Sequence, residues 1–133
     1  MRFFPKNMQA LLICRLALGF SWIYQGAVPK IVCQSSGESE LLGHVIPLRW
    51  ICTAITWMGV GEIVFGLLLL FAIWNWVYWL NIGALAGLTI FVLLFEPYMF
   101  NLPFNPLTLN VSLIALSLVA LLELKKLKKE EFL

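Results

Sequence analysis

A single carboxylate, Glu62, lies in the middle of an apolar run that extends from Ile51 to Ile73 without another charged residue. About 20 helical residues cross the ~30 Å hydrocarbon core of a bilayer, so this run predicts a membrane span with Glu62 near the midplane. An ionisable side chain at that depth costs a few kcal/mol unless it is paired, protonated or hydrated. Glu62 is therefore the first candidate for binding a polar ligand group, for carrying a proton or for pairing with a cation.

Arg15 is the predicted partner of Glu62, because it is the one charged residue inside the preceding apolar segment. Measured from the inner ends of the two predicted helices, the two residues differ in depth by about 6 Å, which two long side chains can bridge. Small residues let transmembrane helices approach closely. At helical spacing, glycines share a face with each charge: Gly19 and Gly26 with Arg15, Gly59 and Gly66 with Glu62.

Several interpretations of Glu62 stay open. A buried pair with Arg15 would be purely architectural and would fix which helices face each other. Alternatively, Glu62 contacts a ligand, handles protons, binds water in a cavity or lies at an interface with another subunit.

In a later segment, Gly83 and Gly87 form a Gly-x-x-x-Gly patch that predicts another close helix crossing.

A second group of polar and aromatic residues is predicted to lie toward the outer ends of the spans. Its members are Tyr24, Gln25, Lys30, Glu96, Thr108 and Asn110, whereas Trp22 shares the helical face of Arg15. Lys30 and Glu96 are of opposite charge and are expected to pair. The group is either a set of ordinary interfacial residues that meet water or the mouth of a cavity leading down to Glu62.

The same residue inventory argues against several cofactors. His44 is the only histidine, so haem held by two histidines of one chain is not expected. One histidine and three scattered cysteines do not provide a zinc site, and no glycine-rich nucleotide-binding loop is present. Cys33 and Cys52 both lie on the predicted outer side, where a disulfide would form in an oxidising compartment. We expect no haem, zinc or nucleotide, no nucleic-acid partner and no self-contained catalytic set; the identity of any other cofactor is left open.

Composition shows which elements must position these residues. Of the 133 residues, 62% are hydrophobic and 12% are charged, against roughly 25% charged in soluble domains. Continuously apolar runs without alternation predict helices, and helices satisfy their own backbone hydrogen bonds in lipid. We therefore predict an all-α membrane protein, a single four-transmembrane-helix bundle over residues 1–133. The predicted helices span residues 8–29, 49–73, 77–95 and 107–124.

Charge distribution predicts the orientation of this bundle. Six lysines and arginines flank the side that holds both termini, against two on the other side, and basic residues favour the cytoplasm. Both termini are thus predicted to be cytoplasmic, with 125–133 as a basic tail, in a multi-pass protein of the bacterial inner membrane. The outer connections are a segment at 39–46 that could form an interfacial amphipathic helix, and a proline-rich loop at 96–106.

Three motifs add a resemblance to a known family. Arg15 and residues 22–30 (Trp-Ile-Tyr-Gln-Gly-Ala-Val-Pro-Lys), residues 59–62 (Gly-Val-Gly-Glu) and residues 103–110 (Pro-Phe-Asn-Pro-Leu-Thr-Leu-Asn) follow each other along the chain. With these motifs the sequence resembles the DoxX-like family of small four-helix membrane proteins. Gln25 stands where that group often has an acidic residue. Some members of the DoxX group are described as subunits of quinone-linked sulfur oxidation or as companions of oxidoreductases, so the resemblance implies a redox or quinone association.

Three functions compete on this basis. The first is a non-catalytic membrane subunit, or a bundle that binds a small amphipathic, quinone-like ligand near Glu62 and Trp22, together with a membrane or redox protein partner. The second is a proton-coupled small-molecule transporter, for which four helices without inverted repeats would need to oligomerise. The third is a structural or assembly factor of the membrane. Partners other than the lipid bilayer, including a second copy of the chain, are not identified by the sequence.

Overall fold

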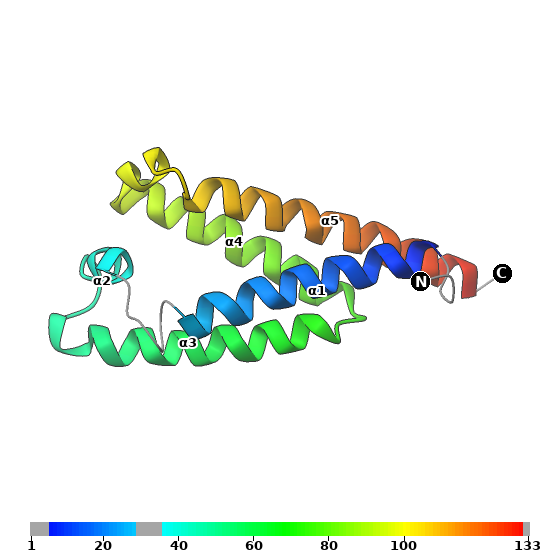
Figure 1. Ribbon diagram of the computed structural model, residues 1–133, viewed down its shortest axis with the longest axis horizontal. Coiled ribbons are helices and arrows are strands. Elements are labelled where there is room, and N and C mark those ends of the chain that lie inside the picture. Colours follow the sequence, from blue (N-terminus) through cyan, green and yellow to red (C-terminus); the bar gives the residue numbers. More distant parts are fainter. Residues whose placement is uncertain (1–5, 29–35, 132–133) are drawn as a thin grey trace.

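A computed structural model describes residues 6–28 and 36–131 of the chain (Figure 1). Within these residues the ordered elements are all helices, and no strand is present. They are α1 (Lys6–Gly26), α2 (Ser36–Leu42), α3 (Leu48–Leu70), α4 (Asn75–Phe95), the 3-10 helix η2 (Pro97–Asn101) and α5 (Pro106–Glu131). The four long helices run along the long axis of the molecule (Figure 1).

Three of the described helices, α3, α4 and α5, are long and apolar enough to cross a membrane. Most of their surface faces outward, as expected for helices surrounded by lipid. Helix α1 is as long as α4 but includes Gln9, Arg15 and Gln25, which makes it less apolar. The chain is thus an all-helical, multi-pass membrane protein, and a fourth span through α1 stays a prediction.

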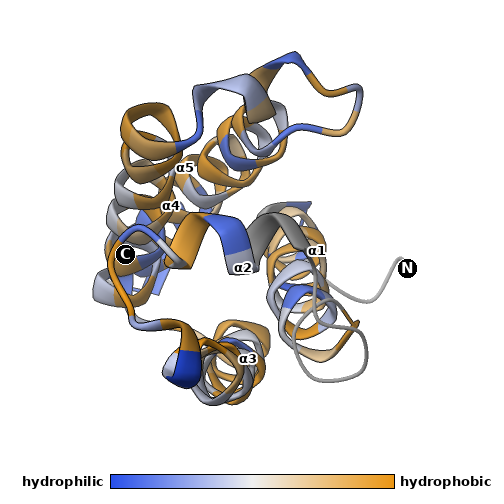
Figure 2. Cartoon of the chain, turned by 90° about the vertical axis from the view of Figure 1, so that its left-hand side faces the viewer, coloured by the Kyte–Doolittle hydropathy of each residue, from blue (hydrophilic) through white to orange (hydrophobic). Residues whose placement is uncertain are grey.

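The helices do not pack in sequence order. Helix α1 packs against α3 on one side and α5 on the other, and α4 packs against α5. The order across the molecule is therefore α3, α1, α5, α4, which separates α3 from the helix that follows it. At one end of the molecule, α2 lies between α3 and the α4–α5 pair (Figure 2).

Glycines bring α1 and α3 unusually close together. A Cβ atom added to Gly26 would lie 2.5 Å from the carbonyl oxygen of Gly59, and one added to Gly66 would lie 2.8 Å from that of Gly19. These backbones can approach only because the side chains are absent. Gly83 and Gly87 behave differently: both are exposed, and an added Cβ would meet no described atom within 4 Å. The close crossing predicted at this second pair is therefore not formed within the described chain.

The helix bounds differ from the predicted ones mainly at the two ends of the chain. Helix α5 continues to Glu131, so the basic residues from Lys125 onward extend the last helix and do not form a separate tail, at least as far as that residue. The predicted amphipathic segment at 39–46 is helical only to Leu42, and the helix begins earlier, at Ser36. Helix α1 begins, and α5 ends, at the same end of the molecule, which we call the terminal end; the other is the α2 end (Figure 1).

Candidate functional site

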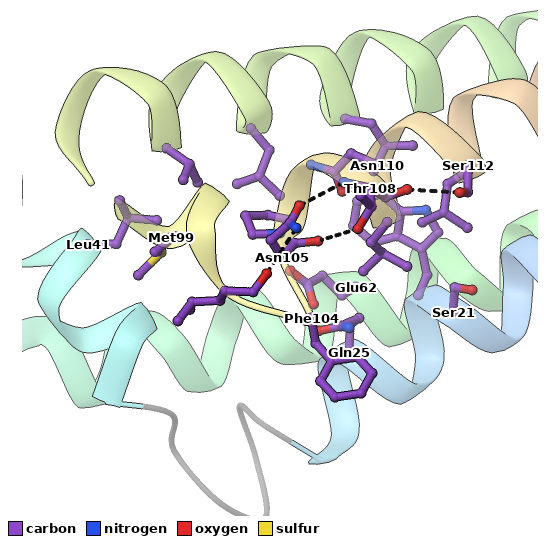
Figure 3. Close-up of a pocket in the computed structure, with 18 of the residues that line it drawn as sticks. Ser21, Gln25, Leu41, Glu62, Met99, Phe104, Asn105, Thr108, Asn110 and Ser112 are labelled. Carbon is purple, nitrogen blue, oxygen red and sulfur yellow. Dashed lines mark hydrogen bonds between the residues drawn. The ribbon is translucent and has the colours of Figure 1, made fainter. Parts of the chain in front are cut away.

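A cavity of about 750 Å³ opens toward the α2 end of the molecule (Figure 3). It lies between α1 and α3 on one side and α4, α5 and the segment joining η2 to α5 on the other. Leu41 of α2 also contributes to its wall. The polar side chains that line it are Ser21, Gln25, Glu62, Asn105, Thr108, Asn110 and Ser112.

Glu62 enters this cavity from α3. The close approach of the helices places the Cβ of Glu62 3.1 Å from the position that a Cβ of Gly26 would occupy. Gln25, the residue before this glycine, lines the same cavity. The side chain of Glu62 is partly buried, and its Oε2 atom is fully buried. The α1–α3 glycines therefore put a carboxylate and an amide beside the same enclosed space.

Arg15 lies elsewhere, and its predicted pairing with Glu62 is wrong. Its Nε donates a 2.9 Å hydrogen bond to the carbonyl oxygen of Leu70, the last residue of α3. The last carbonyls of a helix have no partner within the helix and carry partial negative charge, so a guanidinium is well placed there. The prediction assumed that both helices end at one level, whereas α1 extends about nine residues below Arg15 and α3 ends opposite it.

A chain of hydrogen bonds that starts at Trp22, a residue of the cavity lining, connects three helices. Trp22 Nε1 on α1 donates to Asn81 Oδ1 on α4 over 2.7 Å. Asn81 Nδ2 donates to Ser117 Oγ on α5 over 2.6 Å, and Ser117 donates in turn to the carbonyl oxygen of Leu113. Asn81 and Ser117 are fully buried. Among apolar helices such bonds fix which faces meet, because the alternative is an unsatisfied amide in hydrocarbon.

The wall formed by α5 begins with a capping residue. The side-chain oxygen of Asn105 accepts a 3.0 Å hydrogen bond from the backbone N–H of Thr108, while Pro106 opens the helix. Asparagine at the cap followed by proline is a favoured helix start. One turn further, Asn110 Nδ2 donates to Thr89 Oγ1 of α4 over 2.8 Å, which ties the two helices together beside the cavity.

Two polar contacts hold α2 and the turn after it against the corner between α4 and η2. Tyr98 OH donates to Glu40 Oε2 over 2.9 Å, and His44 Nε2 lies 2.7 Å from Glu96 Oε1. The His44 ring also stacks on Phe95 at a centroid distance of 5.5 Å. His44 thus helps to hold the α2 end of the molecule together. We call this pair of contacts the α2 latch.

The structure brings together five of the predicted residues, because Trp22, Gln25, Glu62, Thr108 and Asn110 all line the cavity. Tyr24 is half-exposed and packs against Phe20, away from it. Lys30 and Cys33 lie outside the described residues, so the predicted Lys30–Glu96 pair and Cys33–Cys52 disulfide stay predictions.

Sequence reasoning missed Asn81 and Ser117, which carry no charge. The signal that could have found Asn81 was an isolated amide inside the third apolar run. In the described part of the chain, no three His, Cys, Asp or Glu side chains come close enough to hold a metal ion.

Comparison with known proteins identifies the family of this chain. The DoxX-like family matches residues 19–118, a region that includes the glycine-lined α1–α3 contact, Glu62 and all the cavity residues named above. No curated protein and no solved structure matches the chain. The match covers most of the sequence, and the protein is therefore a membrane protein of the DoxX-like family.

Proposed function

We propose that this protein binds a small amphipathic molecule in the cavity beside Glu62 and serves as a non-catalytic subunit in membrane redox chemistry. The observation that carries the proposal is the cavity itself, since about 750 Å³ lies within the range of small-molecule sites. A tightly packed, purely architectural Glu62 would leave no such space. The redox setting is supported by the family resemblance alone.

The lining suggests how such a ligand would lie. Leu85, Leu88 and Val92 of α4 offer an apolar wall, while Glu62 and Gln25 offer polar atoms across from it. A ligand with a polar head and an apolar ring or tail satisfies both sides at once. A quinone fits this description because its carbonyl oxygens accept hydrogen bonds from amides such as Gln25 and its ring packs against leucine and tryptophan.

Binding of a quinone analogue tests the proposal. The full-length protein, purified in detergent, would be titrated with a short-chain ubiquinone analogue by calorimetry. Leu88→Trp, which fills the apolar wall, is expected to weaken binding at least tenfold. Leu94→Trp on the same helix is the matched control, because Leu94 is exposed and lies outside the cavity. Absence of binding to the wild type, or equal loss in both variants, would reject the proposal.

Proton-coupled transport is a second candidate, because a buried carboxylate oxygen lies next to a cavity that opens to the surface. It predicts substrate-driven proton flux in vesicles that is lost in Glu62→Gln. Flux that this substitution leaves unchanged would remove the candidate. A structural or assembly role predicts that substitutions around the cavity lower folded yield and affect no specific activity.

We also infer a four-span topology with both termini in the cytoplasm of a bacterial inner membrane. It is supported by the shared position of the start of α1 and the end of α5, and by the lysines at that end. Fusion of a reporter that is active only in the periplasm to either terminus should give no signal. The same reporter inserted after His44 should be active.

A further inference from the structure

A second groove lies at the terminal end of the molecule, whereas the Glu62 cavity opens toward the α2 end. It has a volume of about 310 Å³ and is formed by the first residues of α4 and the last turns of α5. Its lining residues are Asn75, Trp79, Leu121, Leu122, Lys125 and Lys128. We propose that this groove binds the headgroup of an anionic phospholipid, with an acyl chain lying along its leucines.

The charges of the groove fit an anion. Lys125 and Lys128 are exposed and share one face of α5, three residues apart. The structure gives neither of them an acidic partner among the described residues, whereas Lys126 pairs with Glu123 over 2.9 Å. The groove is therefore lined by two ammonium groups and by no carboxylate.

The start of α4 adds to this positive character. Asn75 is the first residue of the helix, which has no side-chain cap and no acidic residue in its first turn. The first N–H groups of a helix need outside acceptors and carry partial positive charge. A phosphate between this turn and the two lysines would accept hydrogen bonds from both sides.

The apolar part of the groove distinguishes a lipid from a free anion. Leu121, Leu122 and Trp79 line it, and Leu122 and Trp79 are both 58% exposed. Helices α4 and α5 are two of the spanning helices, so a groove at their ends lies at headgroup depth. Tryptophan is enriched at that depth, and clustered lysines there attract anionic lipids. A phospholipid of net negative charge matches both features, because its headgroup would bind the two ammonium groups and its acyl chain would pack on the apolar side chains.

The test compares lipids of different charge on the full-length protein. Purified protein would be exchanged into mixed micelles with equal amounts of phosphatidylglycerol and phosphatidylcholine, and retained lipids would be counted by native mass spectrometry. We expect preferential retention of phosphatidylglycerol. Lys125→Gln with Lys128→Gln should reduce that preference more than tenfold, since each lysine contributes roughly a fivefold factor near an anionic surface.

The matched control removes two other lysines at the same end, Lys6 and Lys129, which are exposed and lie outside the groove. This control should keep the preference. Equal preference in wild type and the groove variant, or equal loss in both variants, would overturn the proposal. So would displacement of the retained lipid by millimolar inorganic phosphate, because that result indicates a free-anion site. Both variants keep the Glu62 cavity intact, so this outcome is independent of the proposed quinone binding.

Discussion

Gly26 and Gly59 meet so closely that a Cβ atom on the first would lie 2.5 Å from the carbonyl oxygen of the second. This contact between α1 and α3 is the reason that Glu62 lies beside Gln25. It also accounts for the separation of α3 from α4, since α3 packs on α1 instead. The cavity therefore depends on a backbone contact that tolerates no side chain.

Gly26→Ala should destabilise the protein, because the new methyl group would force the two backbones apart. We expect a loss of about 1–3 kcal/mol, the usual cost of overpacking. Gly83→Ala is the control, since a Cβ there meets no described atom within 4 Å, and it should not destabilise the protein because alanine is the better helix former. Unfolding in mixed micelles of increasing denaturing detergent measures both. Equal effects of the two substitutions would show that the α1–α3 contact is not close in the folded protein.

The bonds from Trp22 through Asn81 to Ser117 predict coupling between three helices. Asn81→Ala should cost about 1–2 kcal/mol, because it leaves the Trp22 N–H without its acceptor. A double-mutant cycle of Trp22→Phe with Asn81→Ala should show coupling near 0.6 kcal/mol, the average for membrane helices. A second cycle that combines Trp22→Phe with the distant Thr56→Ala should show no coupling energy. Strict additivity in the first cycle would mean that the bond contributes nothing to stability.

The α2 latch predicts a response at high pH. The hydrogen bond that Tyr98 donates to Glu40 raises the pKa of Tyr98 above its ordinary value of 10.0. A tyrosine whose pKa is raised on folding adds stability that is complete below pH 10 and is lost as the pH rises through the shifted value. Absorbance near 295 nm should therefore include a contribution from Tyr98 that titrates above the ordinary range in wild type. Its contribution should be missing in Tyr98→Phe and should titrate earlier in Glu40→Gln.

Hydrophobicity and glycine spacing were enough to predict much of this architecture. The apolar runs predicted the long helices, because spanning segments must bury their backbone polarity within themselves. The spacing of Gly19 and Gly26 predicted the face that α1 turns to α3. Gly83 and Gly87 have the same kind of spacing without a contact, since a small-residue pattern does not say which helix, if any, lies against it.

Axial register between helices could not be predicted. It depends on where each helix ends, and the ends of α1 and α3 differ by about nine residues in the packed structure. That shift places Arg15 beside Leu70 and leaves Glu62 to the cavity. Uncharged Asn81 and Ser117 were missed for another reason, which is that only charges were treated as costly inside the membrane. A buried amide carries a cost as well, and it needed a partner.

Because Arg15 and Glu62 lie apart, we expect Arg15 to contribute to the stability of the protein and Glu62 to contribute to ligand binding. Glu62 lies at the level of Gly26, eleven residues beyond Arg15 along α1, a distance of about 16 Å at the helical rise. Arg15→Gln should thus lower stability by about 1–3 kcal/mol, since it removes a charged donor from the end of α3, and should leave the affinity for a quinone analogue unchanged. Glu62→Gln should do the reverse and alter that affinity with little loss of stability, because glutamine keeps the shape and removes the charge. Detergent unfolding of both variants measures the change in stability, and calorimetric titration measures the change in affinity for the quinone analogue. An equal fall in affinity in Arg15→Gln and Glu62→Gln would contradict this separation. It would mean that the two residues are energetically coupled through the α1–α3 contact.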